Sequence, residues 1–185
     1  MTSRVGLRSR ALTELRYVDG TRPKDVDGAS AETGPDDGYV QRVRWLRGEA
    51  SRVRHSAGEH LEQAAEALAA GDPGSASRLR TLAEMASCHY MAYDELATAA
   101  GHRGLAGRFV RGTPAREIEL HRADAAIRRA EGHRERGEAL RHGEDAFAVR
   151  RHRQLAEEAE EKARVAELRA VEILEHRAGI AWELQ

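Results

Sequence analysis

The chain has 185 residues and a mass of 20.4 kDa, enough for one ordinary domain with or without an arm. Its 30 lysines and arginines oppose 31 aspartates and glutamates, so the formal net charge is -1. This balance excludes the strong positive field of a dedicated nucleic-acid or anionic-membrane binder. Because hydrophobic residues make up 41% but aromatic residues only 4%, the core must consist of Ala, Leu and Val.

Membrane-spanning and secreted proteins are not expected classes either. No window approaches the roughly 18 apolar residues of a membrane span, and the basic N-terminus has no apolar stretch behind it. Cys88 is the single cysteine, so an intramolecular disulfide cannot form, and one thiol suits a reducing cytoplasm. We therefore expect a cytoplasmic protein. Arginine supplies nearly all of the positive charge, which we interpret as the codon bias of a GC-rich bacterial genome.

Residues 1–38 differ from the rest of the chain, because glycine, proline and aspartate interrupt them every few positions. Such a segment cannot bury enough apolar surface to offset the entropy that it would lose on ordering. The sequence therefore predicts a flexible N-terminal arm over 1–38, with a possible short helix at 4–17. The alternative is that this arm docks onto a partner or a second subunit.

After the arm, the apolar residues follow a helical period. They recur at intervals of three and four as far as Ala64, which places them on one stripe of a helix. Gly71 ends this helix, and Asp72 and Pro73 supply an N-cap and a first-turn proline for the next one. Because a short turn favours antiparallel neighbours, a helical hairpin is predicted over 39–100.

A Gly/Arg-rich link is predicted over 101–113, where glycines interrupt the helical pattern. An N-cap and a proline then restart the chain, and a tight turn at Gly143 joins the two helices of a second hairpin over 114–183. No alternating run of β-branched residues is present. The expected fold is therefore all-α, an antiparallel helical bundle of two long helical hairpins, in which 39–185 form a four-helix bundle.

The two predicted hairpins resemble each other. Glu-Ala-Leu precedes both turns, and the pattern Arg-x-Arg-x-Leu-Ala-Glu-x-Ala begins at Arg78 and again at Arg151. Duplication of one hairpin explains this similarity, and so does chance between helices rich in the same few residues.

Three histidines are candidate metal or small-ligand contacts. His60 and His89 fall on the core stripes of adjacent helices, and His121 shares a helix face with Glu117 and Asp124. Helical bundles hold metal ions between facing helices. However, the Glu-x-x-His pattern of carboxylate-bridged di-iron sites does not occur. The competing interpretation is structural, with two histidines bonded to neighbouring groups and the third in a ladder of i,i+4 pairs. No cofactor is expected.

No catalytic residues are expected. Cys88 and His89 are neighbours, but on a helix they project about 100° apart, so the ring cannot easily take the thiol proton. We expect a buried, inert cysteine. Phosphate-binding and dinucleotide-binding glycine loops are also missing from the sequence.

The Gly/Arg-rich link is a candidate contact for an anion or a nucleic acid. Arg103, Arg108 and Arg111 supply charge, glycines allow close backbone approach, and the next helix directs its positive end towards the link. Phe109 could stack on a base. The alternative is a flexible connection whose apolar residues cover the end of the core.

The leading functional hypothesis is a non-enzymatic scaffold or adaptor that acts through protein–protein contacts, with a second copy of the chain as the first expected partner. An alanine-rich core buries little area within one chain, so pairing across a subunit boundary would add to it. An apolar surplus near the C-terminus is the candidate interface, and it comprises Leu168, Val171, Ile173, Leu174, Ile180 and Trp182. Alternatively, this segment folds back onto its own bundle. The other hypotheses are a metal- or ligand-binding bundle and an accessory nucleic-acid binder.

Overall fold

The computed structural model describes the backbone of residues 35–183 and the side chains of residues 38–177. This part of the chain forms four helices: α2 (Pro35–Ala69), α3 (Pro73–Gly107), α4 (Pro114–Arg141) and α5 (Ala146–Glu183). Between residues 35 and 183 no strand is present. The predicted all-α class is therefore confirmed. The predicted short helix at 4–17 and most of the predicted arm lie outside the described residues.

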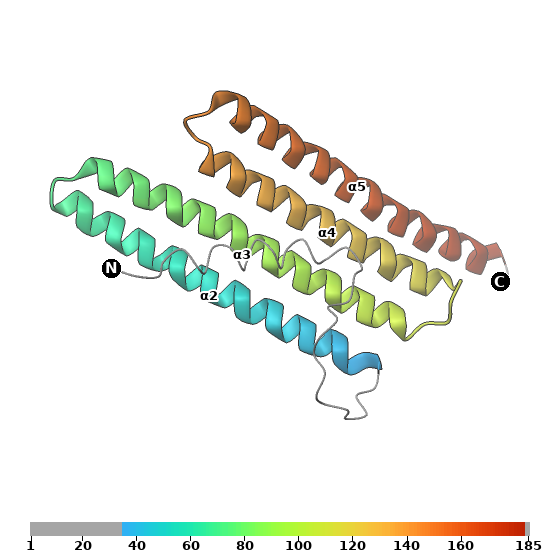
Figure 1. Cartoon of the computed structure of the whole chain (residues 1–185). Coiled ribbons are helices and arrows are strands. Elements are labelled where there is room, and N and C mark those ends of the chain that lie inside the picture. The colour runs from blue at the N-terminus through green and yellow to red at the C-terminus, as the bar shows by residue number, and fades with distance from the viewer. Residues whose placement is uncertain (1–34, 184–185) are drawn as a thin grey trace, which may run out of the picture. The chain divides into compact units, whose positions relative to one another are not determined.

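The helices run antiparallel and lie side by side in chain order (Figure 1). α2 packs against α3, α3 against α4, and α4 against α5. Within residues 35–183 these are the only helix pairs in contact, so α2 and α5 each touch a single neighbour. The two antiparallel hairpins are as predicted, but the bundle that they form is open, because its first and last helices do not meet.

An aspartate begins the second helix of each hairpin. The Asp72 carboxylate accepts a hydrogen bond of 2.9 Å from the Ser75 backbone N–H, and Gly71 turns the chain with a φ of 78°. The Asp145 carboxylate accepts bonds from the backbone N–H groups of Phe147 and Ala148 at 2.9 and 3.1 Å. These bonds lower the pKa of each carboxyl group, because they favour the charged form.

Two predicted boundaries differ from the structure. α2 begins at Pro35 rather than at residue 39, because proline is favourable in the first turn of a helix. α3 continues to Gly107, so the connection to α4 is shorter than the predicted link 101–113. Gly104 explains this extension: a Cβ there would lie 3.1 Å from the Cβ of Tyr39, so the glycine lets α2 approach the last turns of α3.

The core consists mainly of alanine. Buried alanines recur every seven residues along α2 and at alternating intervals of three and four along α5, the repeat of two helices packed along a seam. Their positions are Ala50, Ala57 and Ala64 in α2 and Ala156, Ala159, Ala163, Ala166 and Ala170 in α5. In α4, Gly132 lies 3.4 Å from the backbone oxygen of Ala156, measured from the place of its missing Cβ. Small residues therefore let the helix backbones approach closely.

Many large apolar side chains lie at the surface instead. Trp45, Leu61 and Leu68 of α2 are exposed, and so are several residues along α5. The α5 residues are Phe147, Leu155, Val165, Leu168, Val171 and Leu174. A few large apolar side chains, among them Leu46, Leu96 and Ile118, are buried, but alanine occupies most of the interior positions that large apolar residues usually fill. A search of the described residues finds no helix with the length and apolar character that a membrane span needs.

Overpacking is the expected weakness of such a core. Ala126 is 0% exposed, so Ala126→Leu is expected to destabilise the protein by about 1–3 kcal/mol, because no space exists for the added atoms. In contrast, Ala146→Leu at an exposed position of α5 should change stability by less than about 0.5 kcal/mol. Urea unfolding followed by circular dichroism measures both, and equal losses would contradict the close-packed core.

Candidate functional site

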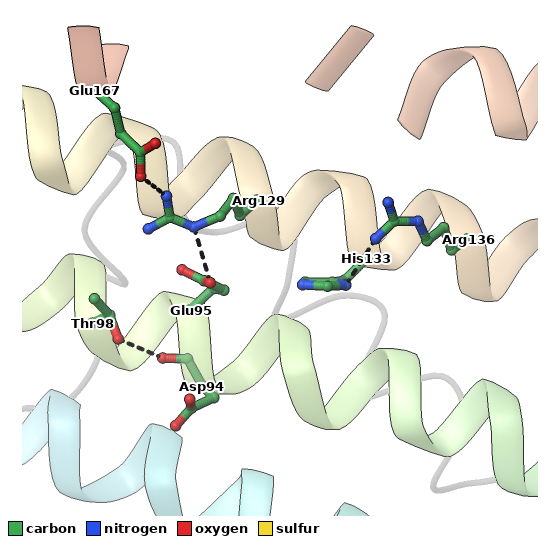
Figure 2. Close-up of polar contacts among 7 residues, drawn as sticks. All are labelled: Asp94, Glu95, Thr98, Arg129, His133, Arg136 and Glu167. Atoms are coloured by element: carbon green, nitrogen blue, oxygen red, sulfur yellow. Dashed lines mark hydrogen bonds and ion pairs between the residues drawn. The ribbon is translucent and has the colours of Figure 1, made fainter. Parts of the chain in front are cut away.

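Charged side chains join the three later helices at the level of Arg129 in α4. Its Nε donates a 2.9 Å hydrogen bond to Glu95 of α3, and one of its terminal nitrogens donates to Glu167 of α5. Figure 2 shows the guanidinium between the two carboxylates. Partial burial alone would lower the pKa of Arg129, but the hydrogen bonds and charges of the two glutamates outweigh it and raise that pKa. Arg129 therefore clamps α3, α4 and α5 in one register.

One turn further along α4, a second polar group faces the same neighbours. Arg136 donates a hydrogen bond to Glu160 of α5, and another of its nitrogens lies 3.4 Å from Nδ1 of His133 (Figure 2). Burial lowers the pKa of His133, and the positive charges of Arg136 and Arg129 lower it further. This histidine therefore favours its neutral form.

A buried carboxylate lies between α3 and α4 near the other end of this interface. Glu119 is 9% exposed and is the one buried charged residue between residues 38 and 177. Its carboxylate lies 2.6 Å from Nδ1 of His102 and accepts a 2.9 Å bond from Arg122. A buried charge is costly unless it is paired, and both carboxylate oxygens have a partner here.

A further polar group lies where α4 turns into α5. The rings of His142 and His152 stack with 5.5 Å between their centroids, and Nδ1 of His152 lies 2.7 Å from a carboxylate oxygen of Glu135. Each of these pairs connects two neighbouring helices, or a helix and the turn beside it. They therefore serve to hold the helices together.

The three predicted metal candidates are not brought together. His60 is on α2, which does not contact α4, whereas His121 is on α4. His89 lies against α4, with its ring 3.4 Å from the place of a Cβ on Gly137. Nδ1 of His60 is buried without a hydrogen-bond partner. Among the residues that the structure describes, no three His, Cys, Asp or Glu side chains are placed to hold a metal ion. The metal hypothesis stays a prediction with no added support.

Cys88 is buried, as predicted. Burial raises the pKa of its thiol, which disfavours the reactive thiolate. Burial also lowers the pKa of His89, and the nearby Arg141 and Arg134 reinforce this against the opposite effect of Glu138.

The four predicted anion contacts lie at the end of α3 and in the connection that follows it. Arg103 is on α3, Arg108 caps its end, and Arg111 and Phe109 are in the connection to α4. All four are exposed. The connection is held by Arg116, which donates to the carbonyl oxygens of Ala106 and Phe109 at 3.2 and 3.4 Å. The nucleic-acid hypothesis therefore stays a prediction.

The predicted interface residues occupy α5. Leu168, Val171 and Leu174 are exposed, and Ile173 is half-buried. Ile180 and Trp182 are in the last turns of α5, beyond the residues whose side chains are described. Within residues 38–177, no other part of the chain folds back over the exposed face of α5, because α5 contacts α4 alone.

Comparisons with protein-family models, with curated proteins and with solved structures give no match to this chain.

Loss of the three-helix clamp should destabilise the fold. Arg129→Ala leaves the half-buried carboxylate of Glu95 and the exposed carboxylate of Glu167 without their partner, so a loss of roughly 1–2 kcal/mol is expected in urea unfolding. Arg141→Ala is the matched control, because Arg141 pairs with Glu138 on its own helix and holds no second helix. Equal losses in the two variants would show that Arg129 does not act as a clamp.

The fold should lose stability as the pH falls. The pKa values of His89 and His133 are lowered in the fold, so the unfolded chain binds protons more readily. Stability is therefore complete above the ordinary histidine pKa of about 6.5 and decreases as the pH falls from there through the folded values. Urea unfolding at pH 7.5 and 5.5 should show a smaller loss for the variant His89→Gln/His133→Gln than for the wild type. The exposed-site variant His55→Gln should follow the wild type, and a double variant that does so too would refute this account.

Proposed function

We propose that this protein is a non-enzymatic helical scaffold that acts through contacts with other protein chains, the simplest being a second copy of itself. The observation that supports this most is the distribution of apolar residues between the helix contacts and the surface. Alanine and glycine hold the helices together, while large apolar side chains remain exposed along the two edges of an open bundle. Exposed apolar clusters rimmed by polar residues mark interaction sites.

The C-terminal half of α5 carries one such cluster. Leu168 and Val171 are three residues apart, with Val165 three residues earlier and Leu174 three residues later, so the four side chains spread over about half of the helix circumference, with Leu168 and Val171 in the middle. Arg164 and other charged residues flank them. Apolar residues between charged ones on a long helix are typical of helix–helix association, in which charges set the partner and its orientation.

The polar groups inside the bundle support the same function. Arg129, Glu119 and His152 each interact with a residue of a neighbouring helix, so they fix the order and register of the helices. Such fixed geometry is what a scaffold requires in order to present its edges. We further infer, from the lone thiol and the arginine-rich composition, that the protein acts in the cytoplasm of a bacterium.

The mass in solution tests this proposal. Sedimentation equilibrium of the wild type should give a mass above 20.4 kDa that decreases on dilution. The variant Leu168→Glu/Val171→Glu should weaken association through α5 by at least about tenfold, because burying an unpaired charge is costly. Val110→Glu, an exposed change in the α3–α4 connection, is the control. A wild type that stays at the mass of one chain at every concentration would contradict self-association.

A further inference from the structure

The face of α2 that points away from α3 carries a second, uncovered seam. Its residues follow one another at alternating intervals of three and four, the same repeat as the buried seams. We call this the outer seam of α2, and it consists of Gly48, Ser51, His55, Gly58, Glu62, Ala65 and Ala69. All seven residues are exposed, and no described helix other than α3 contacts α2.

The two glycines of the outer seam have no function within the described chain. Glycine in the middle of a helix is unfavourable, because it loses more conformational entropy than alanine. In α4, Gly132 and Gly137 are each explained by a neighbouring helix whose atoms lie 3.4 Å from the place of a Cβ. At Gly48 and Gly58 nothing lies within 4 Å of that place. The outer seam therefore has the composition of a close helix contact, but no second helix among residues 35–183 covers it.

The charges of α2 indicate what the second helix is. Between Val40 and Ala57 the sequence has five arginines and one glutamate, whereas between Gly58 and Ala69 it has three glutamates and neither arginine nor lysine. One half of the helix is therefore basic and the other half acidic. Two such helices attract each other when they run antiparallel, since each basic half then faces an acidic half, and they repel each other when they run parallel.

We propose that the outer seam of α2 pairs with the outer seam of a second copy, antiparallel, about a twofold axis at Gly58. This inference rests on the proposed scaffold function and names one of its contacts. The seam is symmetric about Gly58 to within one residue, so in the pair Ser51 faces Ala65, Gly48 lies opposite Ala69, and His55 lies opposite Glu62. A twofold dimer requires such a self-complementary interface, in which the same surface of both copies meets. Small residues along the seam let the two backbones approach as closely as α4 and α5 do.

The flanking charges take part in the same pair. Arg47 and Arg52 of one copy lie along the half that faces Glu62 and Glu66 of the other, whereas Arg54 lies over the ring of Tyr90 in α3. Arg52 also pairs with the half-buried Glu49, and His55 lies 3.5 Å from Glu59, but both pairs are within α2, and Arg52 and His55 themselves are exposed. Exposed pairs within one helix are weak, so they do not prevent the basic side chains from turning to a second copy.

Cysteine cross-linking tests the twofold axis. In a Cys88→Ala background, Gly58→Cys places two thiols across the axis, where oxidation should double the mass on a non-reducing gel. Gly48→Cys is the matched control on the same seam. In the antiparallel pair the two thiols introduced at this position lie about 30 Å apart, so this variant should keep the mass of one chain on the same gel. Both substitutions meet open space within the chain, so both proteins should fold. Cross-linking of both variants, or of neither, would overturn the proposal.

A charge exchange provides the second measurement. Glu62→Lys/Glu66→Lys makes both halves of α2 basic, and Arg44→Glu/Arg47→Glu/Arg52→Glu makes both acidic, because two arginines and four glutamates then lie between Val40 and Ala57. In a Leu168→Glu/Val171→Glu background, which removes association through α5, each variant should sediment as a monomer alone, and an equimolar mixture should recover a mass of two chains. The corresponding reversal on α5, Glu157→Lys/Glu158→Lys, should change nothing. Variants that still self-associate as the wild type does would overturn the pairing through α2.

The outcomes separate this inference from the proposed function. If the wild type associates but Gly58→Cys does not cross-link, the scaffold remains supported and the outer seam of α2 is not its contact. If the wild type is a monomer at every concentration, self-association fails and this inference fails with it. If the pairing is correct, the variant Leu168→Glu/Val171→Glu on α5 should keep the mass of a dimer.

Discussion

Close approach of helix backbones is the constraint on which the structure depends. Alanine and glycine at the contact positions leave little apolar area to bury, so the helices gain from packing their backbones closely along their full length. Long, straight contacts between chain neighbours satisfy this requirement. A closed core with large side chains at its centre does not, and residues 38–177 do not form one, because alanines line the helix contacts while large apolar side chains such as Leu61 and Leu168 are exposed.

Small side chains alone would let such helices slide past one another, because one alanine seam resembles the next. The polar contacts between helices remove this freedom. Arg129 fits between Glu95 and Glu167 in one register only, and His102 meets Glu119 in the same register. A shift of one turn would leave the buried Glu119 and the half-buried Arg129 and Glu95 without their partners, which is more costly than the loss of a few apolar contacts. The polar contacts therefore fix the register of the helices, and the small residues let the helix backbones approach closely.

Much of this fold could be predicted from local patterns. The helical period, the aspartate cap at Asp72 and the proline starts are interactions within a few residues, and they set nearly all of the helix bounds, whereas the cap at Asp145 was predicted only as part of a tight turn. The open arrangement of the helices and the ion pairs of Arg129 depend on how each helix is rotated and shifted relative to its neighbour. The spacing of residues along a single helix does not contain this information. Glu95 and Glu119 lie next to the apolar residues Leu96 and Ile118, and this was the signal that the sequence offered. The length of α3 was underestimated because Gly104 contacts Tyr39, a distant residue whose position the sequence does not show.

The distance between α2 and α5 tests the open arrangement most directly. Spin labels at Leu61→Cys and Leu155→Cys, in a Cys88→Ala background diluted with unlabelled protein, report this distance within one chain. With interaxial spacings of about 8–10 Å, three successive contacts predict a separation of roughly 20–30 Å. A single short distance of about 10 Å would show that α2 and α5 pack together in a closed bundle, and the exposed edges that the account requires would not exist.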